Sequence, residues 1–288
     1  MSGEKDWAQL LKWDQPLEGE KPGENARTDD VDDTAAAAVA EFPPAVLVVG
    51  ACGGAGSTTT ALGIANSAAL AGASSVAIDA TVGGGDLVDR GASRAPGLHS
   101  VEGLLEIRLP SGDLRDDVFD ACASTTSAGA RILHQSGDRE PYVDLRPLDP
   151  YLRARRYVAI YDAGRLWRPA HVRPLQWLDE HTPIVLTVPS RADAFNRMRY
   201  SLDCLADFGG VDRLRHTIVV VTNQRPGVRP DDVDALRKYL SGRAADVLAV
   251  PYDEELAVGA VVDHSRLRQA TTAAYDQICA ALAALPVG

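Results

Sequence analysis

Short apolar runs that alternate with helical patterns constrain the fold of this chain more than any other feature. The runs are AVLVV (45–49), SSVAID (74–79), RYVAIYD (156–162), PIVLTVP (183–189), TIVVVTN (217–223) and DVLAVP (246–251). Nearly continuous apolar runs are typical of parallel strands that are buried on both faces of a sheet. With the intervening helices, they predict an α/β fold: a single doubly wound, mainly parallel sheet with helices on both faces.

Helical periodicity between the runs is clearest in three segments. We expect helices within 58–72, 192–209 and 265–285, and the first ends at Gly72 because glycine commonly follows the C-terminus of a helix. Parallel strands place their carboxyl ends at one edge of the sheet, where ligands bind in folds of this type. Polar residues that follow the strands are therefore the candidate site residues.

The N-terminal 44 residues differ in composition from the rest of the chain. They are rich in acidic residues, glycine, proline and alanine, and most of them show no sustained apolar face. Segments of this kind bury too little apolar surface to offset the entropy of ordering the chain. We therefore expect residues 1–44 to form a disordered acidic tail and residues 45–288 to form one folded domain.

One short segment of the tail, DWAQLLKWD (6–14), departs from this composition. Trp7, Leu10 and Leu11 can share one face of a short helix, and Trp13 lies close by. Large apolar side chains are costly to leave in water, so we expect the segment to dock on another surface. Two alternatives remain open, docking on the protein's own domain and docking on a partner.

The overall composition restricts the classes of partner and location. The net charge of −11 argues against strong nucleic-acid binding. No run of 18 or more uncharged apolar residues occurs, and the N-terminus shows no secretory pattern, so we expect a cytoplasmic protein without its own membrane anchor. The four cysteines and six histidines show no metal-ligand spacing, so we expect reduced thiols and no metal site built on these residues.

A glycine-rich turn, VGACGGAGSTTTALG (49–63), joins the first strand to the first helix. In a phosphate-binding loop, glycines let backbone N–H groups wrap the phosphate oxygens, and the helix N-terminus adds positive potential. A lysine normally adds a point charge, and the Ser or Thr that follows binds magnesium. Here Ser57 takes the lysine position, and no lysine occurs between positions 22 and 237. The backbone part of the loop is present and its charged part is missing.

This loop and the later strand ends resemble the MinD/ParA superfamily of deviant Walker ATPases, which are P-loop NTPases. The matching segments are CGGAGSTT (52–59), IDATVGGGDL (78–87), AIYDAG (159–164), VLTVPSRADA (185–194), VVVTNQR (219–225) and VPYDEEL (250–256). The resemblance implies a P-loop NTPase fold from about residue 45 to the end, with ATP or ADP and Mg²⁺ as cofactors. The nucleotide-binding residues that it implies are Gly53, Gly54, Ala55, Gly56, Ser57, Thr58, Thr59 and Asn223.

Three departures from the family's pattern fall at catalytic positions. Cys52 stands at the signature lysine, Ser57 at the phosphate lysine and Thr81 at the second aspartate of the DxD motif. Phosphoryl transfer relies mainly on positioning and charge stabilisation. Removal of one oxyanion-hole donor raises the activation free energy of a reaction by about 2.7–4 kcal/mol. If each missing group here has a similar effect, ATP hydrolysis slows by orders of magnitude. We therefore expect weak nucleotide binding without turnover, or no physiological nucleotide, rather than an active enzyme.

Other motif residues of the family are retained. Asp79 and Asp162 are the only candidates for a catalytic role, and with Thr58 they are the implied magnesium ligands. The resemblance assigns an adenine contact to Asn223. Each residue also has a structural interpretation, because a carboxylate after a buried strand can hold a loop and asparagine is common in turns.

The branch of the family is indicated by a few residues. The net charge of −11 argues against the DNA-partitioning branch. The C-terminus, YDQICAALAALPVG, lacks the basic face of a membrane-targeting helix. The stretch GGGDLVDRG (83–91) is similar to atypical members that are associated with pilus assembly and secretion systems.

The leading hypothesis is a pseudo-ATPase that forms homodimers in the manner of the family and acts as a protein-interaction scaffold. It would position a membrane-associated machine of the bacterial cell envelope and reach the membrane through its protein partners. One alternative is a slow, partner-activated ATPase of the family. Another alternative is a DNA-partition relative, which salt-sensitive DNA binding would support.

Overall fold

The computed structural model describes residues 42–93, 100–107, 114–136, 143–166, 176–226 and 230–286. The segment 6–14, and all but the last three residues of the tail predicted for residues 1–44, lie outside these ranges. Within them, no helix is both long enough and apolar enough to cross a membrane.

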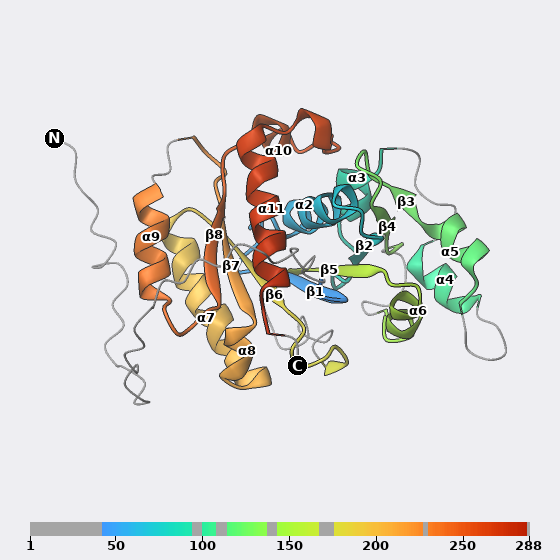
Figure 1. Ribbon diagram of the computed structural model, residues 1–288, viewed down its shortest axis with the longest axis horizontal. Coiled ribbons are helices and arrows are strands. Elements are labelled where there is room, and N and C mark those ends of the chain that lie inside the picture. Colours follow the sequence, from blue (N-terminus) through green and yellow to red (C-terminus); the bar gives the residue numbers. More distant parts are fainter. Residues whose placement is uncertain are drawn as a thin grey trace, which may run out of the picture.

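An eight-stranded sheet forms the centre of the described structure, in the order β3-β4-β2-β5-β1-β6-β7-β8 (Figure 1). The strands are β1 (Ala45–Gly50), β2 (Ser75–Asp79), β3 (Ser124–Thr125), β4 (Arg131–Leu133), β5 (Val158–Arg165), β6 (Ile184–Pro189), β7 (Thr217–Thr222) and β8 (Asp246–Val250). Neighbouring strands pair in parallel, except for the antiparallel pair β3 and β4. The predicted α/β fold with a mainly parallel sheet is therefore confirmed.

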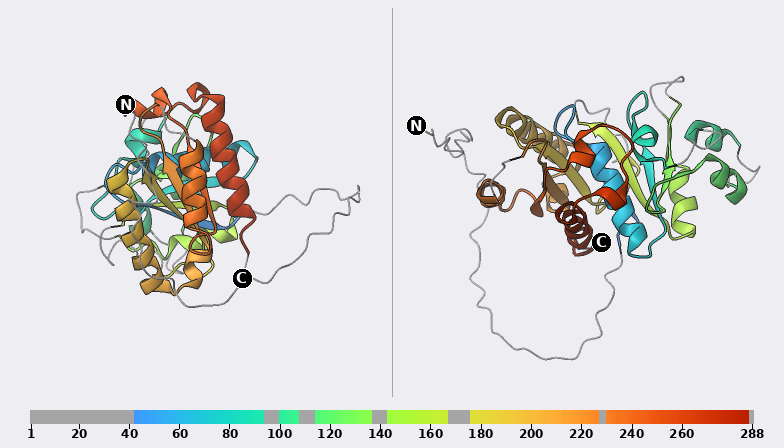
Figure 2. Two further views of the ribbon diagram at one scale, coloured as in Figure 1. Left: turned by 90° about the vertical axis from the view of Figure 1, so that its left-hand side faces the viewer. Right: turned by 90° about the horizontal axis from the view of Figure 1, so that it is seen from above.

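Helices cover both faces of this sheet, as predicted. They are α2 (Ser57–Leu70), α3 (Leu87–Gly91), α4 (Val101–Glu106), α5 (Asp116–Cys122), α6 (Leu148–Ala154), α7 (Ala192–Gly209), α8 (Asp212–Arg215), α9 (Pro230–Tyr239), α10 (Glu254–Ala257) and α11 (Gln269–Ala283). The view from above in Figure 2 separates α7 from α2 and α11, which lie on the other side of the sheet.

Strand β1 shows why the apolar runs form buried strands. Successive side chains of a strand point to opposite faces of the sheet. Val46 and Val48 pack into the core under α2 and α11, whereas Leu47 and Val49 pack into the core under α7. Each position therefore needs an apolar side chain, which produces the continuous pattern in the sequence.

Helices α2 and α11 pack closely because of one small residue. A Cβ atom at Gly63 would fall well inside van der Waals contact with the ring of Tyr275, which is fully buried. The absence of a side chain at Gly63 therefore lets the aromatic ring lie directly on the backbone of α2. This contact holds the helix that begins at the glycine-rich turn.

The structure adds detail to the expected secondary structure in two places. The helix expected within 265–285 spans Gln269–Ala283, and a 3-10 turn at His264–Arg266 precedes it. Strands β3 and β4 were not predicted, since runs of two and three residues are too short to show a periodic pattern. All four cysteines are free of disulfides.

Candidate functional site

A cavity of about 670 Å³ lies at the carboxyl ends of the central strands. The glycine-rich turn after β1 forms one wall, together with residues 57–59 at the start of α2. The last residues of β5, and residues at and after the ends of β7 and β8, form other walls, and residues of α3 and α10 also line the cavity. The segments with sequence-predicted site residues are therefore brought together around one space.

The glycine-rich turn has the backbone conformation of an anion-binding loop. Gly54 and Gly56 adopt positive φ angles of 69° and 82°, a region that favours glycine. No atom lies within 4 Å of the position that a Cβ would take at Gly53 or Gly54, so the backbone is open there. Helix α2 has no side-chain cap at Gly56 and no acidic residue in its first turn. Its N-terminal N–H groups therefore remain available to an anion.

Two side chains from the end of β7 hold this loop in place. The hydroxyl of Thr222 donates a hydrogen bond of 2.9 Å to the carbonyl oxygen of Ala55. The side-chain amide of Gln224 donates to the carbonyl oxygen of Gly54. The loop is thus preorganised by residues about 170 positions away in the sequence, which the sequence analysis did not identify.

Asp79 is fully buried at the end of β2, and its carboxylate is occupied by the following loop. One oxygen accepts hydrogen bonds from the backbone N–H and the hydroxyl of Thr81, at 3.0 and 2.5 Å, and the other accepts from the N–H of Gly85 at 2.7 Å. Burial raises the pKa of Asp79, and these hydrogen bonds oppose the rise. Asp79 therefore holds the loop, and Thr81 uses its hydroxyl for the same purpose.

Asp162, which pairs with Asp79 on the neighbouring strand β5, has a different environment. Its Oδ1 accepts a hydrogen bond of 3.1 Å from the N–H of Gly164, whereas its Oδ2 is buried and has no partner among the described residues. Burial raises its pKa to about 6, with the nearby charge of Asp79 adding to the rise, and the hydroxyls of Thr58 and Ser57 act in the opposite direction. A buried carboxylate oxygen without a donor is suited to a cation.

The residues around Asp162 fit Mg²⁺ in part. The hydroxyl of Thr58 lies close enough to influence Asp162 and donates to Asp86 Oδ1 at 3.1 Å. Mg²⁺ prefers hydroxyl, carboxylate, phosphate and water oxygens, and it rarely uses an all-protein cage. In the described part of the chain, no three His, Cys, Asp or Glu side chains gather as a metal site. Thr58 and Asp162 fit an ion that is shared with phosphates, whereas both oxygens of Asp79 are already hydrogen-bonded.

Asn223 supplies a second buried acceptor. It follows β7 and lines the cavity, and its backbone N–H donates to the carbonyl oxygen of Val250 at 3.0 Å. Its side-chain oxygen is buried without a partner in the described structure. Such an acceptor is satisfied by an N–H donor on a ligand, for example the exocyclic amine of adenine.

Two arginines on the cavity wall supply positive charge that the loop itself lacks. Arg90, on α3, is only 8% exposed, and its Nη2 donates to the carbonyl oxygen of Leu256 at 3.1 Å. No described carboxylate lies within ion-pairing distance of Arg90. Arg165, at the end of β5, also lines the cavity. The sequence analysis did not single out Arg165, although its position three residues after Asp162 places it at the carboxyl edge.

The position of the signature lysine also has an arginine beside it. Nη2 of Arg191, which follows β6, lies 3.8 Å from the sulfur of Cys52. The guanidinium also pairs with Asp193 at 3.2 Å, and about half of the Arg191 side chain is exposed. Positive charge is therefore present at the outer rim of the loop as well.

Comparison with solved structures identifies the fold as that of MinD/ParA P-loop ATPases. The MinC:MinD cell division protein complex of Aquifex aeolicus matches with a TM-score of 0.62 and 13% identity, over 85% of this chain and 98% of that chain. A ParA family ATPase from Chlorobium tepidum TLS matches with a TM-score of 0.62 and 15% identity, over 82% and 98%.

A third similar structure holds a nucleotide. Cobyrinic acid a,c-diamide synthase from Mycobacterium smegmatis, with bound ADP and magnesium, matches with a TM-score of 0.52 and 17% identity, over 83% of this chain and 93% of that chain. No family model matches the chain, and no curated protein matches it in sequence. At these identities the likeness concerns the fold, and the activity has to be argued from the site.

Proposed function

We propose that the cavity at the carboxyl edge binds ATP or ADP with Mg²⁺ and that the chain turns the nucleotide over poorly or not at all. The observation that carries this proposal is a pair of unpartnered buried acceptors beside an open glycine loop. Asn223 Oδ1 belongs to a residue of the cavity wall, and Asp162 Oδ2 lies two residues before Gly164 of that wall. Buried acceptors are costly unless a ligand or ion satisfies them. A magnesium ion at Asp162 and an adenine at Asn223 would satisfy one each.

In this proposal the phosphates lie against the N–H groups of residues 53–59, as in other anion sites at helix N-termini. Mg²⁺ would neutralise phosphate charge, and Thr58 with Asp162 would hold it. Arg90 would contribute the positive charge that Ser57 does not provide. Each of these groups binds or orients the nucleotide.

Slow hydrolysis of the nucleotide follows from the side chains at positions 57 and 81. Ser57 carries no charge, and the hydroxyl of Thr81 is hydrogen-bonded to Asp79 at 2.5 Å instead of facing a water molecule. Loss of one charge-stabilising donor costs about 2.7–4 kcal/mol of barrier. Two such losses slow hydrolysis by a factor of about 10⁴ or more.

We further propose that the protein acts as an interaction scaffold, with homodimers and contacts to the proteins of a membrane-associated bacterial machine. Val258 and Val261 support such contacts, because they are 75% and 44% exposed on the segment after α10. Gly259, between them, lines the nucleotide cavity. A nucleotide could therefore alter the surface that a partner contacts. The pilus-assembly or secretion setting rests on the resemblance at residues 83–91.

Calorimetric titration of the full chain with Mg-ATP and Mg-ADP tests the binding proposal. We expect measurable binding by the native protein and binding about tenfold tighter by Ser57→Lys, which restores one charge-assisted contact. Ser57→Ala is the matched control and should bind like the native protein. Absence of binding by both the native protein and Ser57→Lys would rule out a nucleotide function.

An assay of phosphate release from ATP, on the same preparations, distinguishes the scaffold hypothesis from the ATPase hypothesis. Phosphate release at a rate comparable to active ATPases would contradict the scaffold proposal. Release that appears only with an added cellular protein would favour the partner-activated ATPase. Binding to DNA that weakens steeply with salt would favour the partition relative.

A further inference from the structure

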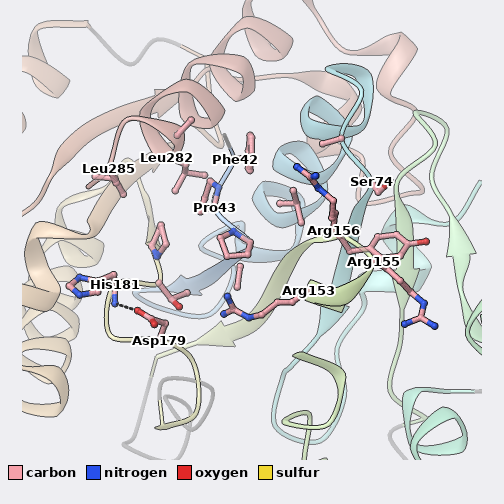
Figure 3. A pocket seen from close by; sticks show the side chains of 18 of the residues that line it. Phe42, Pro43, Ser74, Arg153, Arg155, Arg156, Asp179, His181, Leu282 and Leu285 are labelled. Atoms are coloured by element: carbon pink, nitrogen blue, oxygen red, sulfur yellow. Dashed lines mark hydrogen bonds between the residues drawn. The ribbon is translucent and has the colours of Figure 1, made fainter. Parts of the chain in front are cut away.

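A second cavity, of about 910 Å³, lies at the amino edge of the sheet, opposite the nucleotide cavity. Its walls are residues that immediately precede β1, β2, β5 and β6, together with the C-terminal end of α11 and the residues after it. Figure 3 shows the side chains that line it. None of the residues assigned to the nucleotide site takes part.

One side of this cavity is apolar, and the other carries three arginines together with Asp179 and His181. Phe42, Pro43, Leu282 and Leu285 lie together on the apolar side (Figure 3). On the other side, Figure 3 shows Arg153 and Arg156 directed toward the cavity and Arg155 directed away from it. Arg153 also pairs with Asp149 of its own helix at 2.7 Å, and 40% of its side chain stays exposed. Arg155 pairs with Asp116 at 2.5 Å and stacks on the ring of Tyr151. The cavity therefore suits a ligand with both large apolar and acidic side chains.

Arg156 occupies a backbone position where glycine is strongly preferred. It is the only described residue other than glycine with a positive φ, at 57°. It follows the C-terminus of α6 in a Schellman motif, in which the N–H of Tyr157 donates to Leu152 O at 2.9 Å and the N–H of Arg156 donates to Arg153 O at 3.0 Å. A side chain in this conformation is strained, and such strain is commonly retained for a function of that side chain.

We propose that the segment DWAQLLKWD (6–14) of the same chain docks in this cavity. The described structure starts at Phe42, which is itself part of the cavity wall, so the preceding chain emerges at the site. Residues 15–41 give a connection of 27 residues, which is long enough to bring the segment back. The binding site is therefore within reach of its ligand without any change of the domain.

The chemistry of the segment matches the two sides of the cavity. Trp7, Leu10 and Leu11 share one face of a helical turn and would cover the apolar side. Asp6 and Asp14, at the two ends, would face Arg153 and Arg156. The 41 residues before Phe42 carry eleven acidic and four basic side chains, so the whole tail is attracted to this cationic edge.

Limited trypsin digestion of the full chain tests the docking. Lys12 lies inside the segment and Arg27 lies in the connection, so cleavage at Arg27 is an internal reference in every sample. We expect cleavage at Lys12 in the native protein to be slower than at Arg27 by about tenfold or more, because docked chain resists proteolysis. Mass spectrometry of the products gives both rates.

Two variants remove the two sides of the contact. Arg156→Gly removes the cation and retains the fold, since glycine adopts a positive φ without strain. Trp7→Ser with Trp13→Ser removes the apolar anchors and leaves the domain unchanged. Both should raise Lys12 cleavage to the Arg27 rate. Arg115→Gly, which removes an exposed arginine outside the cavity, is the matched control and should leave Lys12 protected.

Two results would overturn the proposal. The first is equal cleavage at Lys12 and Arg27 in the native protein. The second is protection of Lys12 that disappears on dilution, because a second copy would then supply the segment. Binding of the nucleotide does not enter this experiment, so its outcome is independent of the proposed function.

Discussion

Asp79 and Asp162 lie directly opposite each other on the neighbouring strands β2 and β5, and both side chains are fully buried. Three hydrogen bonds from the following loop satisfy Asp79, whereas Asp162 keeps one oxygen without a donor. Two carboxylates that pair across neighbouring strands therefore have different environments. Asp79 stabilises the loop, whereas Asp162 keeps one buried oxygen without a hydrogen-bond donor among the described residues.

The raised pKa of Asp162 predicts a specific pH dependence of stability. Burial raises this pKa to about 6, above the value of 3.8 for an unperturbed aspartate, so the folded state holds the proton more tightly than the unfolded state. The stabilising contribution of the protonated form is fully present below about pH 3.8 and is lost as the pH rises through 6. Above pH 6 the buried charge costs a few kcal/mol.

Asp162→Asn should therefore increase the free energy of unfolding by about 1–3 kcal/mol at pH 7.5 and change it little near pH 4. Urea denaturation at both pH values measures the difference. Asp79→Asn is the matched comparison and should be destabilising at both, because the amide cannot accept the three hydrogen bonds. A change for Asp162→Asn that is the same at both pH values would contradict this assignment.

Arg90→Gln should weaken the binding of Mg-ADP by about tenfold or more, because a charge-assisted contact to phosphate is worth about 1.5–3 kcal/mol. The same substitution at Arg237, which pairs with Asp234 and Asp246 far from the cavity, should have no effect. Calorimetric titration measures both affinities, and thermal unfolding verifies that each variant is folded. Unchanged affinity in Arg90→Gln would place Arg90 outside the nucleotide contacts.

Tyr161→Phe should raise the free energy of unfolding by about 1 kcal/mol. The hydroxyl of Tyr161 is buried without a described hydrogen-bond partner, and its ring keeps the edge contact with Trp177 after the substitution. Tyr151→Phe is the control, since the hydroxyl of Tyr151 donates to Asp116 at 2.8 Å and its removal should be destabilising. The midpoints of urea denaturation, compared at a constant m-value, give the change in free energy of unfolding for both variants. Destabilisation by Tyr161→Phe would indicate a satisfied hydroxyl.

Gly63→Ala should destabilise the fold by about 1–3 kcal/mol, because its Cβ would overlap the buried ring of Tyr275. The gain in helix propensity of about 1 kcal/mol is too small to offset a displaced α11. Gly53→Ala, where a Cβ meets no atom within 4 Å, should change stability by less than about 0.5 kcal/mol. Calorimetric melting of both variants tests the contrast, and equal effects would contradict the packing argument.

The sequence determined the layout of this protein because its signals are local and repeated. Six apolar runs predicted strands β1, β2, β5, β6, β7 and β8, since residues buried on both faces of a sheet leave no room for polar alternation. The same reasoning predicted that Asp79, Asp162 and Asn223 would gather with the glycine-rich turn, because parallel strands end at one edge. The lysine missing at Ser57 was also visible without a structure.

The tertiary structure alone decided what those side chains are free to do. Whether a carboxylate is satisfied depends on hydrogen bonds such as that of Thr81 to Asp79, which require three-dimensional coordinates. Arg165 and Arg90 line the cavity because of where β5 ends and how α3 packs. The amino-edge cavity combines segments from Phe42 to Leu285, so no local pattern could indicate it. Local periodicity specifies secondary structure, whereas electrostatics and cavities arise from contacts between residues that are distant in sequence.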